Sequence, residues 1–348
     1  MKIISITTEV KQTALKTPFV TALRRVENVE FVRVVLICEN GMIGIGEAPA
    51  TKAITGEDIE DILNSIESVK DRLKSHMPRE ALLLLHSTCH DIGSSAKAAL
   101  DMALFCLLAK EKKLPLHKYL GAKKTTVLKT DVTISLNNPH AMLKDATMAC
   151  EDGSDILKIK FGKDISHAID VTKQISICLP HAMLLIDANQ AWSVEGCLRY
   201  IQETKDIKLE LIEQPVVAED TKGLKVITQN SHLPIVADEA VFSLEDAKNI
   251  IESKSADMIN IKLMKCGGIT KAIEILEYAK QKGVKCMLGS MLEGPYSINA
   301  ALHLAMAYSD TILHIDLDSP LLYKEFPQEL DFKFDKNQVC FATNLNQR

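Results

Sequence analysis

The chain has 348 residues, of which 47% are hydrophobic and 25% are charged, as in ordinary globular enzymes large enough for a barrel and a smaller unit. Its net charge of −5 offers no basic surface to nucleic acid, and the sequence has no signal-peptide pattern and no apolar run that could span a membrane. Nine irregularly spaced cysteines without a CxxC pair indicate reduced thiols and a cytoplasmic protein.

The first 125 residues or so predict an α+β unit. Residues 31–38 and 42–47 are β-rich, and the Asn-Gly pair between them is a strong hairpin signal. Residues 57–75 and 94–113 then carry apolar side chains at helical spacing. Strands followed by helices in this way are typical of an antiparallel sheet covered by helices.

From about residue 130, short apolar runs alternate with helical stretches at intervals of about 25 residues. We predict eight strands, at residues 131–136, 156–161, 183–187, 209–213, 235–238, 258–262, 284–289 and 313–316. Runs this rich in Val, Ile and Leu indicate parallel strands buried on both faces, and eight of them favour a closed barrel. The alternative is an open doubly wound sheet, but no GxGxxG follows the first strand. Residues 330–343 predict a terminal hairpin, which we expect to return and pair with the N-terminal unit.

Charged side chains stand where five successive predicted strands end: Lys160, Asp187, Glu213, Asp238 and Lys262. They are 24 to 27 residues apart, so we expect them at the same height around the barrel mouth, where barrel enzymes have their active sites. Three converging carboxylates suit Mg²⁺, which prefers hard oxygen ligands. A lysine on either side suits proton transfer at the two faces of one substrate carbon.

These residues resemble the enolase superfamily, in its muconate lactonizing enzyme subgroup. That subgroup has Lys-x-Lys on the second barrel strand, here Lys158-Ile159-Lys160, followed by Asp, Glu and Asp as metal ligands on the next three strands and a Lys on the sixth. Gly44-Ile45-Gly46-Glu47-Ala48 and Gly267-Gly268-Ile269-Thr270 are also similar to the family.

The resemblance implies an α/β fold with a modified (β/α)7β TIM-like barrel. The barrel would cover residues 126–322, with an N-terminal α+β capping domain at 1–125 that is completed by the C-terminal segment, 323–348. It also implies chemistry: Lys160 and Lys262 exchange a proton at the two faces of an α-carbon, and Mg²⁺ stabilises the enediolate between the two steps. Lys158 would lower the pKa of its neighbour and contact the substrate carboxylate. Members that resemble mandelate racemase have a histidine on the seventh strand, and its absence here disfavours that subgroup.

Within the subgroup, three features are similar to the L-Ala-D/L-Glu epimerases, which act on dipeptides. Asp316 and Asp318 lie on one face of the eighth strand, where that family holds the dipeptide's α-ammonium. Residues 18–24 resemble a mobile cap loop whose arginine, here Arg24, pairs with the glutamate side chain, and residues 53–56 resemble a second cap loop. Three further residues fall where that family contacts substrate: Thr133, Ser290 and Met291.

The implied function is Mg²⁺-dependent interconversion of L-Ala-L-Glu and L-Ala-D-Glu in cell-wall peptide recycling. We expect a cytoplasmic homo-oligomer that binds neither nucleic acid nor membranes. The alternatives are an o-succinylbenzoate synthase, a cycloisomerase, an N-acylamino acid racemase, an epimerase of hydrophobic dipeptides, or a non-catalytic metal-binding barrel. Arg24 argues against cationic dipeptides. Lys265 and Glu239, near the mouth, are expected to support the site residues or to be solvated.

Overall fold

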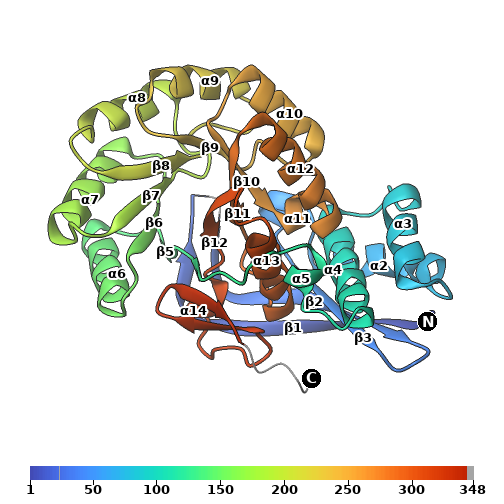
Figure 1. Cartoon of the computed structure of the whole chain (residues 1–348). Coiled ribbons are helices and arrows are strands. Elements are labelled where there is room, and N and C mark those ends of the chain that lie inside the picture. Colours follow the sequence, from blue (N-terminus) through green and yellow to red (C-terminus); the bar gives the residue numbers. More distant parts are fainter. Residues whose placement is uncertain (23, 343–348) are drawn as a thin grey trace.

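The N-terminal part of the chain forms a three-stranded antiparallel sheet, drawn in blue in Figure 1. In the computed structural model, which describes residues 1–22 and 24–342, the strands are β1 (Ile3–Val20), β2 (Arg25–Cys38) and β3 (Ile43–Pro49). Five helices follow: α1 (Lys52–Thr55), α2 (Ile59–Leu73), α3 (Pro78–Thr88), α4 (Ser94–Glu111) and α5 (Leu116–Tyr119). The predicted hairpin and the two predicted helices are confirmed, because β2 pairs with β3 and the helices are α2 and α4.

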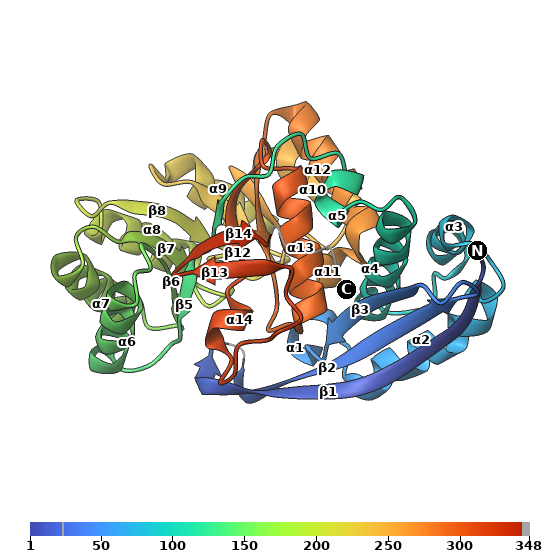
Figure 2. The same cartoon turned by 60° about the horizontal axis from the view of Figure 1, so that its bottom comes forward.

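Helix α4 is the centre of this unit and is buried on nearly all sides. It packs against β3 on one side and against α11 (Leu263–Cys266) of the following domain on the other (Figure 2). The approach to β3 is close because two glycines face the helix: a Cβ on Gly46 would lie 2.0 Å from the carbonyl oxygen of Ala99, and one on Gly44 would lie 2.3 Å from that of Ala103.

The rest of the fold is a barrel of eight parallel strands in sequential order, surrounded by helices (Figure 1). The strands are β5 (Val132–Ile134), β6 (Ile156–Lys160), β7 (Met183–Asp187), β8 (Leu209–Glu213), β9 (Ile235–Ala237), β10 (Met258–Lys262), β11 (Lys285–Gly289) and β12 (Ile312–Asp316). The helices are α6 (Pro139–Glu151), α7 (Ile165–Cys178), α8 (Val194–Glu203), α9 (Thr221–Asn230), α10 (Leu244–Ser253), α11, α12 (Ile269–Lys282) and α13 (Pro295–Ala307). The ring closes where Asp131 N donates to Ile315 O at 3.2 Å. All eight predicted strands are confirmed, and so is the (β/α)7β barrel with its N-terminal cap.

The segment after the barrel returns to the cap, but its hairpin does not pair there. After α14 (Ser319–Leu322), Tyr323 bridges Leu15 of β1, and Lys324 N donates to Ala14 O at 2.8 Å. The predicted hairpin is present as β13 (Phe332–Asp335) and β14 (Gln338–Phe341), and residues 343–348 lie outside the described part. The expectation that it pairs with the N-terminal unit is wrong: β14 pairs with β4 (Leu128–Lys129), the short strand just before the barrel, in a separate three-stranded sheet.

Two buried carboxylates of the cap bind the first turns of barrel helices. Asp101 of α4 accepts hydrogen bonds from Ile269 N at 2.6 Å and from Thr270 Oγ1 at 2.6 Å, at the start of α12. Glu47 of β3 accepts from Tyr296 N at 2.8 Å, at the start of α13, and from Arg33 Nε at 2.7 Å. Negative charge is favourable at a helix N-terminus, so these contacts fix the cap over the barrel mouth. No helix among the described residues is long and apolar enough to cross a membrane.

Candidate active site

The barrel strands end at the charged residues that the sequence analysis singled out. In the sheet, Lys160, Asp187 and Glu213 are level with one another on β6, β7 and β8. Glu213 pairs with Val236, so Asp238 lies two residues farther along, beyond the end of β9. The prediction of one common height is therefore wrong. Neighbouring strands of a barrel are staggered, so equal spacing in sequence does not give equal height. An offset of two residues keeps Asp238 on the same face as Val236.

Each of the two terminal lysines binds a different carboxylate. Lys160 Nζ lies 2.7 Å from Asp187 Oδ2, and Lys262 Nζ lies 2.7 Å from Asp238 Oδ2. Burial favours the neutral form of Asp187, but Lys160 and Lys158 outweigh burial and hold the pKa of Asp187 at about 2. In the same way, burial lowers the pKa of Lys262, but the Asp238 carboxylate raises it above its ordinary value. These pairs mark the two sides of the site.

Lys158 lies deeper than the other lysines and is fully buried. Its Nζ is 2.6 Å from Asp316 Oδ2, 2.7 Å from Glu213 Oε2 and 3.2 Å from Asp187 Oδ2. It does not line the cavity described below, so the structure places it beneath the substrate space, among carboxylates.

The three predicted metal ligands form a buried set of hard oxygen donors. Asp187, Glu213 and Asp238 are at most 1% exposed. Glu213 Oε2 makes no hydrogen bond within the described part of the chain, although Lys158 Nζ is near it. Burial, outweighing the attraction of Lys158, raises the pKa of Glu213 to about 7. A divalent cation would relieve both features, so the residues present fit Mg²⁺.

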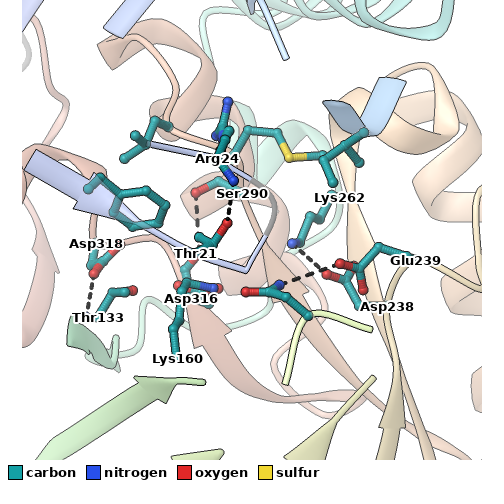
Figure 3. Close-up of a pocket in the computed structure, with 15 residues that line it drawn as sticks. Thr21, Arg24, Thr133, Lys160, Asp238, Glu239, Lys262, Ser290, Asp316 and Asp318 are labelled. Carbon is teal, nitrogen blue, oxygen red and sulfur yellow. Dashed lines mark hydrogen bonds and ion pairs between the residues drawn. The ribbon is translucent and has the colours of Figure 1, made fainter. Parts of the chain in front are cut away.

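A small cavity opens at the mouth, between barrel and cap (Figure 3). Nine of the predicted site residues line it: Arg24, Thr133, Lys160, Asp238, Lys262, Ser290, Met291, Asp316 and Asp318. Figure 3 shows Lys160 and Lys262 on different sides of this space. Arg24 lies away from Asp316 and Asp318 and also away from Asp238 and Glu239. Phe19 and Ile54 add apolar walls from the two predicted cap loops. Leu23 of the first loop lies outside the described residues.

The first cap loop is attached to the barrel by backbone contacts. Val20 N donates to Ser135 Oγ at 3.2 Å, and Leu136 N donates to Val20 O at 3.0 Å. Within the described residues Arg24 makes no ion pair, and burial lowers the pKa of its guanidinium. A partly buried arginine that faces a cavity without a carboxylate partner is suited to bind an anionic ligand group.

The acidic end of the cavity contains a residue that the sequence analysis missed. Asp318 Oδ2 accepts a hydrogen bond from Thr133 N at 2.7 Å, and Asp316 binds Lys158. The carboxylate of Asp131 is buried beside both. Its position two residues before Thr133, on the same face of the first strand, is the signal that could have identified it.

Lys265 and Glu239 also belong to the site, and neither is solvated: they are 2% and 7% exposed. Lys265 Nζ lies 2.5 Å from Asp238 Oδ1 and 3.0 Å from Asn260 O. Glu239 lines the cavity and accepts a hydrogen bond from Asn189 Nδ2 at 3.4 Å. The sequence indicated that both residues lie near the mouth but did not determine whether they are buried or solvated.

Comparison with known families covers both parts of the chain. Residues 3–121 match the family described as mandelate racemase / muconate lactonizing enzyme, N-terminal domain, and residues 141–339 match the enolase C-terminal domain-like family. The chain is 60% identical to the L-amino acid-D/L-Glu epimerase of Sulfurimonas denitrificans, over 97% of this chain and 99% of that protein. It is 42% identical to the L-Ala-D/L-Glu epimerase of Clostridium acetobutylicum, over 88% and 87% of the two chains.

Solved structures give the same picture. A substrate-liganded complex of the L-Ala-D/L-Glu epimerase from Bacillus subtilis superposes with a TM-score of 0.95 at 37% identity, covering 98% of this chain and 97% of that one. The dipeptide epimerase from Enterococcus faecalis V583, in complex with Mg and the dipeptide L-Leu-L-Tyr, gives a TM-score of 0.92 at 33% identity, covering 98% of each chain.

Proposed function

Because this chain belongs to the mandelate racemase / muconate lactonizing enzyme family, and within it to the dipeptide epimerases, which are isomerases, we propose that it interconverts L-Ala-L-Glu and L-Ala-D-Glu. The observation that carries this proposal is the cavity with Lys160 and Lys262 on two sides, an acidic pair at one end, and Arg24, which has no ion pair among the described residues. The expected role in recycling cell-wall peptides, the cytoplasmic location and the homo-oligomer remain predictions.

Asp187, Glu213 and Asp238 are the residues that would hold Mg²⁺. Three buried carboxylates at the ends of neighbouring strands suit this cation, and the related E. faecalis protein was solved with Mg. When bound, the cation supplies positive charge to the carboxylate of the substrate and so makes the neighbouring α-proton more acidic.

The two lysines perform the inversion in this proposal. Lys160 projects from the end of β6 and Lys262 from the end of β10, with the carboxylate strands between them. One ammonium or amine group then stands at each face of the α-carbon of the second residue. The neutral amine on one side takes the α-proton, and the ammonium on the other side delivers a proton to the opposite face. Lys160 also contacts the ring of Phe19, with Nζ 5.8 Å from the ring centroid, which shields it from water on the cap side.

The polarity of the cavity sets the orientation of the dipeptide. Asp316 and Asp318 would accept hydrogen bonds from the α-ammonium, while Arg24 on the cap would pair with the glutamate side chain. Thr133, Ser290 and Met291 also line the cavity, with Thr133 beside Asp318 at the acidic end. N-acylated substrates and cycloisomerase substrates carry no ammonium and would offer Asp316 and Asp318 no cation from the cavity side, which disfavours those alternatives.

The test is solvent exchange at the glutamate α-carbon, followed by NMR in D2O with L-Ala-L-Glu and Mg²⁺. We expect deuterium to enter that carbon as L-Ala-D-Glu appears, and we expect Lys160→Ala and Lys262→Ala each to abolish inversion. Exchange only with dipeptides whose side chains are uncharged would support an epimerase but contradict the proposed pairing of Arg24 with the glutamate side chain. No exchange with any dipeptide would contradict the proposal and leave the cycloisomerases or a non-catalytic barrel.

A further inference from the structure

The acidic end of the cavity contains more negative charge than its neighbours balance. Asp131, Asp316 and Asp318 each place a carboxylate oxygen within 4.8 Å of the other two, and they are 1%, 5% and 4% exposed. Asp316 binds Lys158 and Asp318 accepts from Thr133 N. Both oxygens of Asp131 lack a hydrogen-bond partner within the described part of the chain. An unpartnered buried carboxylate is costly, so something must satisfy Asp131.

The positive groups around the cluster are committed elsewhere. Lys158, on the adjacent strand β6, is the nearest cation, but its ammonium is shared with Glu213 and Asp187. Lys160 and Lys262 act on Asp316 only at longer range, since they bind Asp187 and Asp238. One shared ammonium therefore faces three carboxylates, and a proton is the smallest cation that can restore the balance.

The pKa values of the cluster agree with its geometry. Burial and the charge of Asp316 raise the pKa of Asp131 well above its ordinary range. Burial and Asp316 also raise the pKa of Asp318, to about 6. Asp316 itself has a lowered pKa, because Lys158 and the two other lysines outweigh its burial. The cluster thus retains a proton on the Asp131 and Asp318 side while Asp316 stays ionised.

Asp316 and Asp318 line the cavity, whereas Asp131 lies behind them. We propose that Asp131 stores a proton shared with this pair when the cavity is empty, and that the α-ammonium of an entering dipeptide expels it. The carboxyl O–H bond breaks, the proton passes to the buffer, and ammonium N–H groups donate to Asp316 and Asp318. Asp131 is then a positioning residue that keeps the empty site neutral enough to stay folded. This inference rests on the proposed function.

The measurement is calorimetric titration of the Mg²⁺-loaded protein with L-Ala-Gly at pH 6, in buffers of different ionisation enthalpy. This dipeptide carries the ammonium but has no stereocentre to invert, so the heat reports binding alone. We expect release of a large fraction of one proton per ligand. At pH values below the pKa of the cluster, the affinity should increase with increasing pH, by up to about tenfold per pH unit.

Asp131→Asn should bind L-Ala-Gly with clearly less proton release than the wild type, because only Asp318 can still lose a proton, and its affinity should depend less on pH. Asp170→Asn, at an exposed position on α7, should behave as the wild type. Binding without proton release by the wild type would overturn this inference and leave the proposed function intact, even if Asp131→Asn does not fold. Absence of L-Ala-Gly binding by the wild type would overturn this inference, while the solvent-exchange experiment with L-Ala-L-Glu tests the proposed function separately. Loss of a second bound Mg²⁺ in Asp131→Asn would show a metal site instead and overturn proton storage.

Discussion

Asp238 has a lysine at each of its two carboxylate oxygens. Lys262 Nζ is 2.7 Å from Oδ2, and Lys265 Nζ is 2.5 Å from Oδ1. Lys262 also faces the cavity, while Lys265 is turned below it and bonds to Asn260 O as well. Lys265 therefore holds the orientation of this carboxylate without lining the cavity, which is the role expected of it if Asp238 binds Mg²⁺ as proposed.

We therefore expect Lys265→Met to weaken Mg²⁺ binding about 10- to 100-fold, because Asp238 loses the contact that orients it. Direct titration of the metal by calorimetry measures this without reference to turnover. Lys271→Met, on the outer turn of α12, removes a lysine that pairs with Glu274 and should leave the affinity unchanged. Equal affinity in the Lys265 variant and the wild type would contradict this role.

Arg24 gives a second prediction at the scale of one side chain. Arg24→Ala should raise KM for L-Ala-L-Glu by about one to two orders of magnitude, the worth of a hydrogen bond to a charged group, with a smaller effect on an uncharged dipeptide such as L-Ala-L-Ala. Steady-state kinetics on both substrates separate the two effects. The adjacent Arg25→Ala is the control, because Arg25 is exposed and pairs with Glu27. A parallel loss on both dipeptides would mean that Arg24 supports the loop rather than the ligand.

At the scale of elements, the sequence predicted the bounds of the strands better than it predicted the level of each strand end along the barrel axis. Strands β7, β8 and β10 match their predicted bounds, because each is an apolar run that stops at a charged residue. The level of Asp238 could not be predicted, since the stagger between β8 and β9 is a property of the closed barrel. The role of Asp131 was hidden for a related reason: its neighbours Asp316 and Asp318 come from the far end of the barrel sequence and meet it only when the ring closes.

The contact between β3 and α4 carries a prediction about stability. Gly46→Ala would place a methyl group 2.0 Å from the carbonyl oxygen of Ala99, and neither backbone can move without separating the sheet from the helix. We expect a loss of about 1–3 kcal/mol or more in the free energy of unfolding, measured by denaturant titration. Gly162→Ala meets only a flexible methyl of Leu136, at 3.1 Å, and should cost much less. Similar stability of the two variants would refute the close approach.

At the scale of the whole molecule, the barrel mouth beneath the cap contains an excess of buried negative charge. The residues described there include four lysines and seven carboxylates: Lys158, Lys160, Lys262, Lys265, Asp131, Asp187, Glu213, Asp238, Glu239, Asp316 and Asp318. Like charges in a buried space repel and weaken the folded state. A bound divalent cation reduces that repulsion, so metal binding and folding are linked.

Mg²⁺ should therefore stabilise the protein against heat and denaturant. At a free concentration about 100 times Kd the expected gain is about 2.7 kcal/mol, lost on addition of EDTA. Thermal unfolding with and without the metal measures this, and Glu213→Gln should abolish most of the difference. Equal unfolding temperatures for the wild type in Mg²⁺ and in EDTA would argue against a metal at these carboxylates.

The meeting of β1 with the chain after α14 has a consequence for synthesis on the ribosome. The strand that carries Phe19 towards the mouth is among the first parts made, yet its contacts at Ala14 and Leu15 come from Lys324 and Tyr323, made after every barrel strand. Translation adds only about 5–20 residues per second, so these two contacts form many seconds after β1 can pair with β2. A nascent chain thus holds every lysine for proton transfer before the strand that carries Phe19 meets the C-terminal segment.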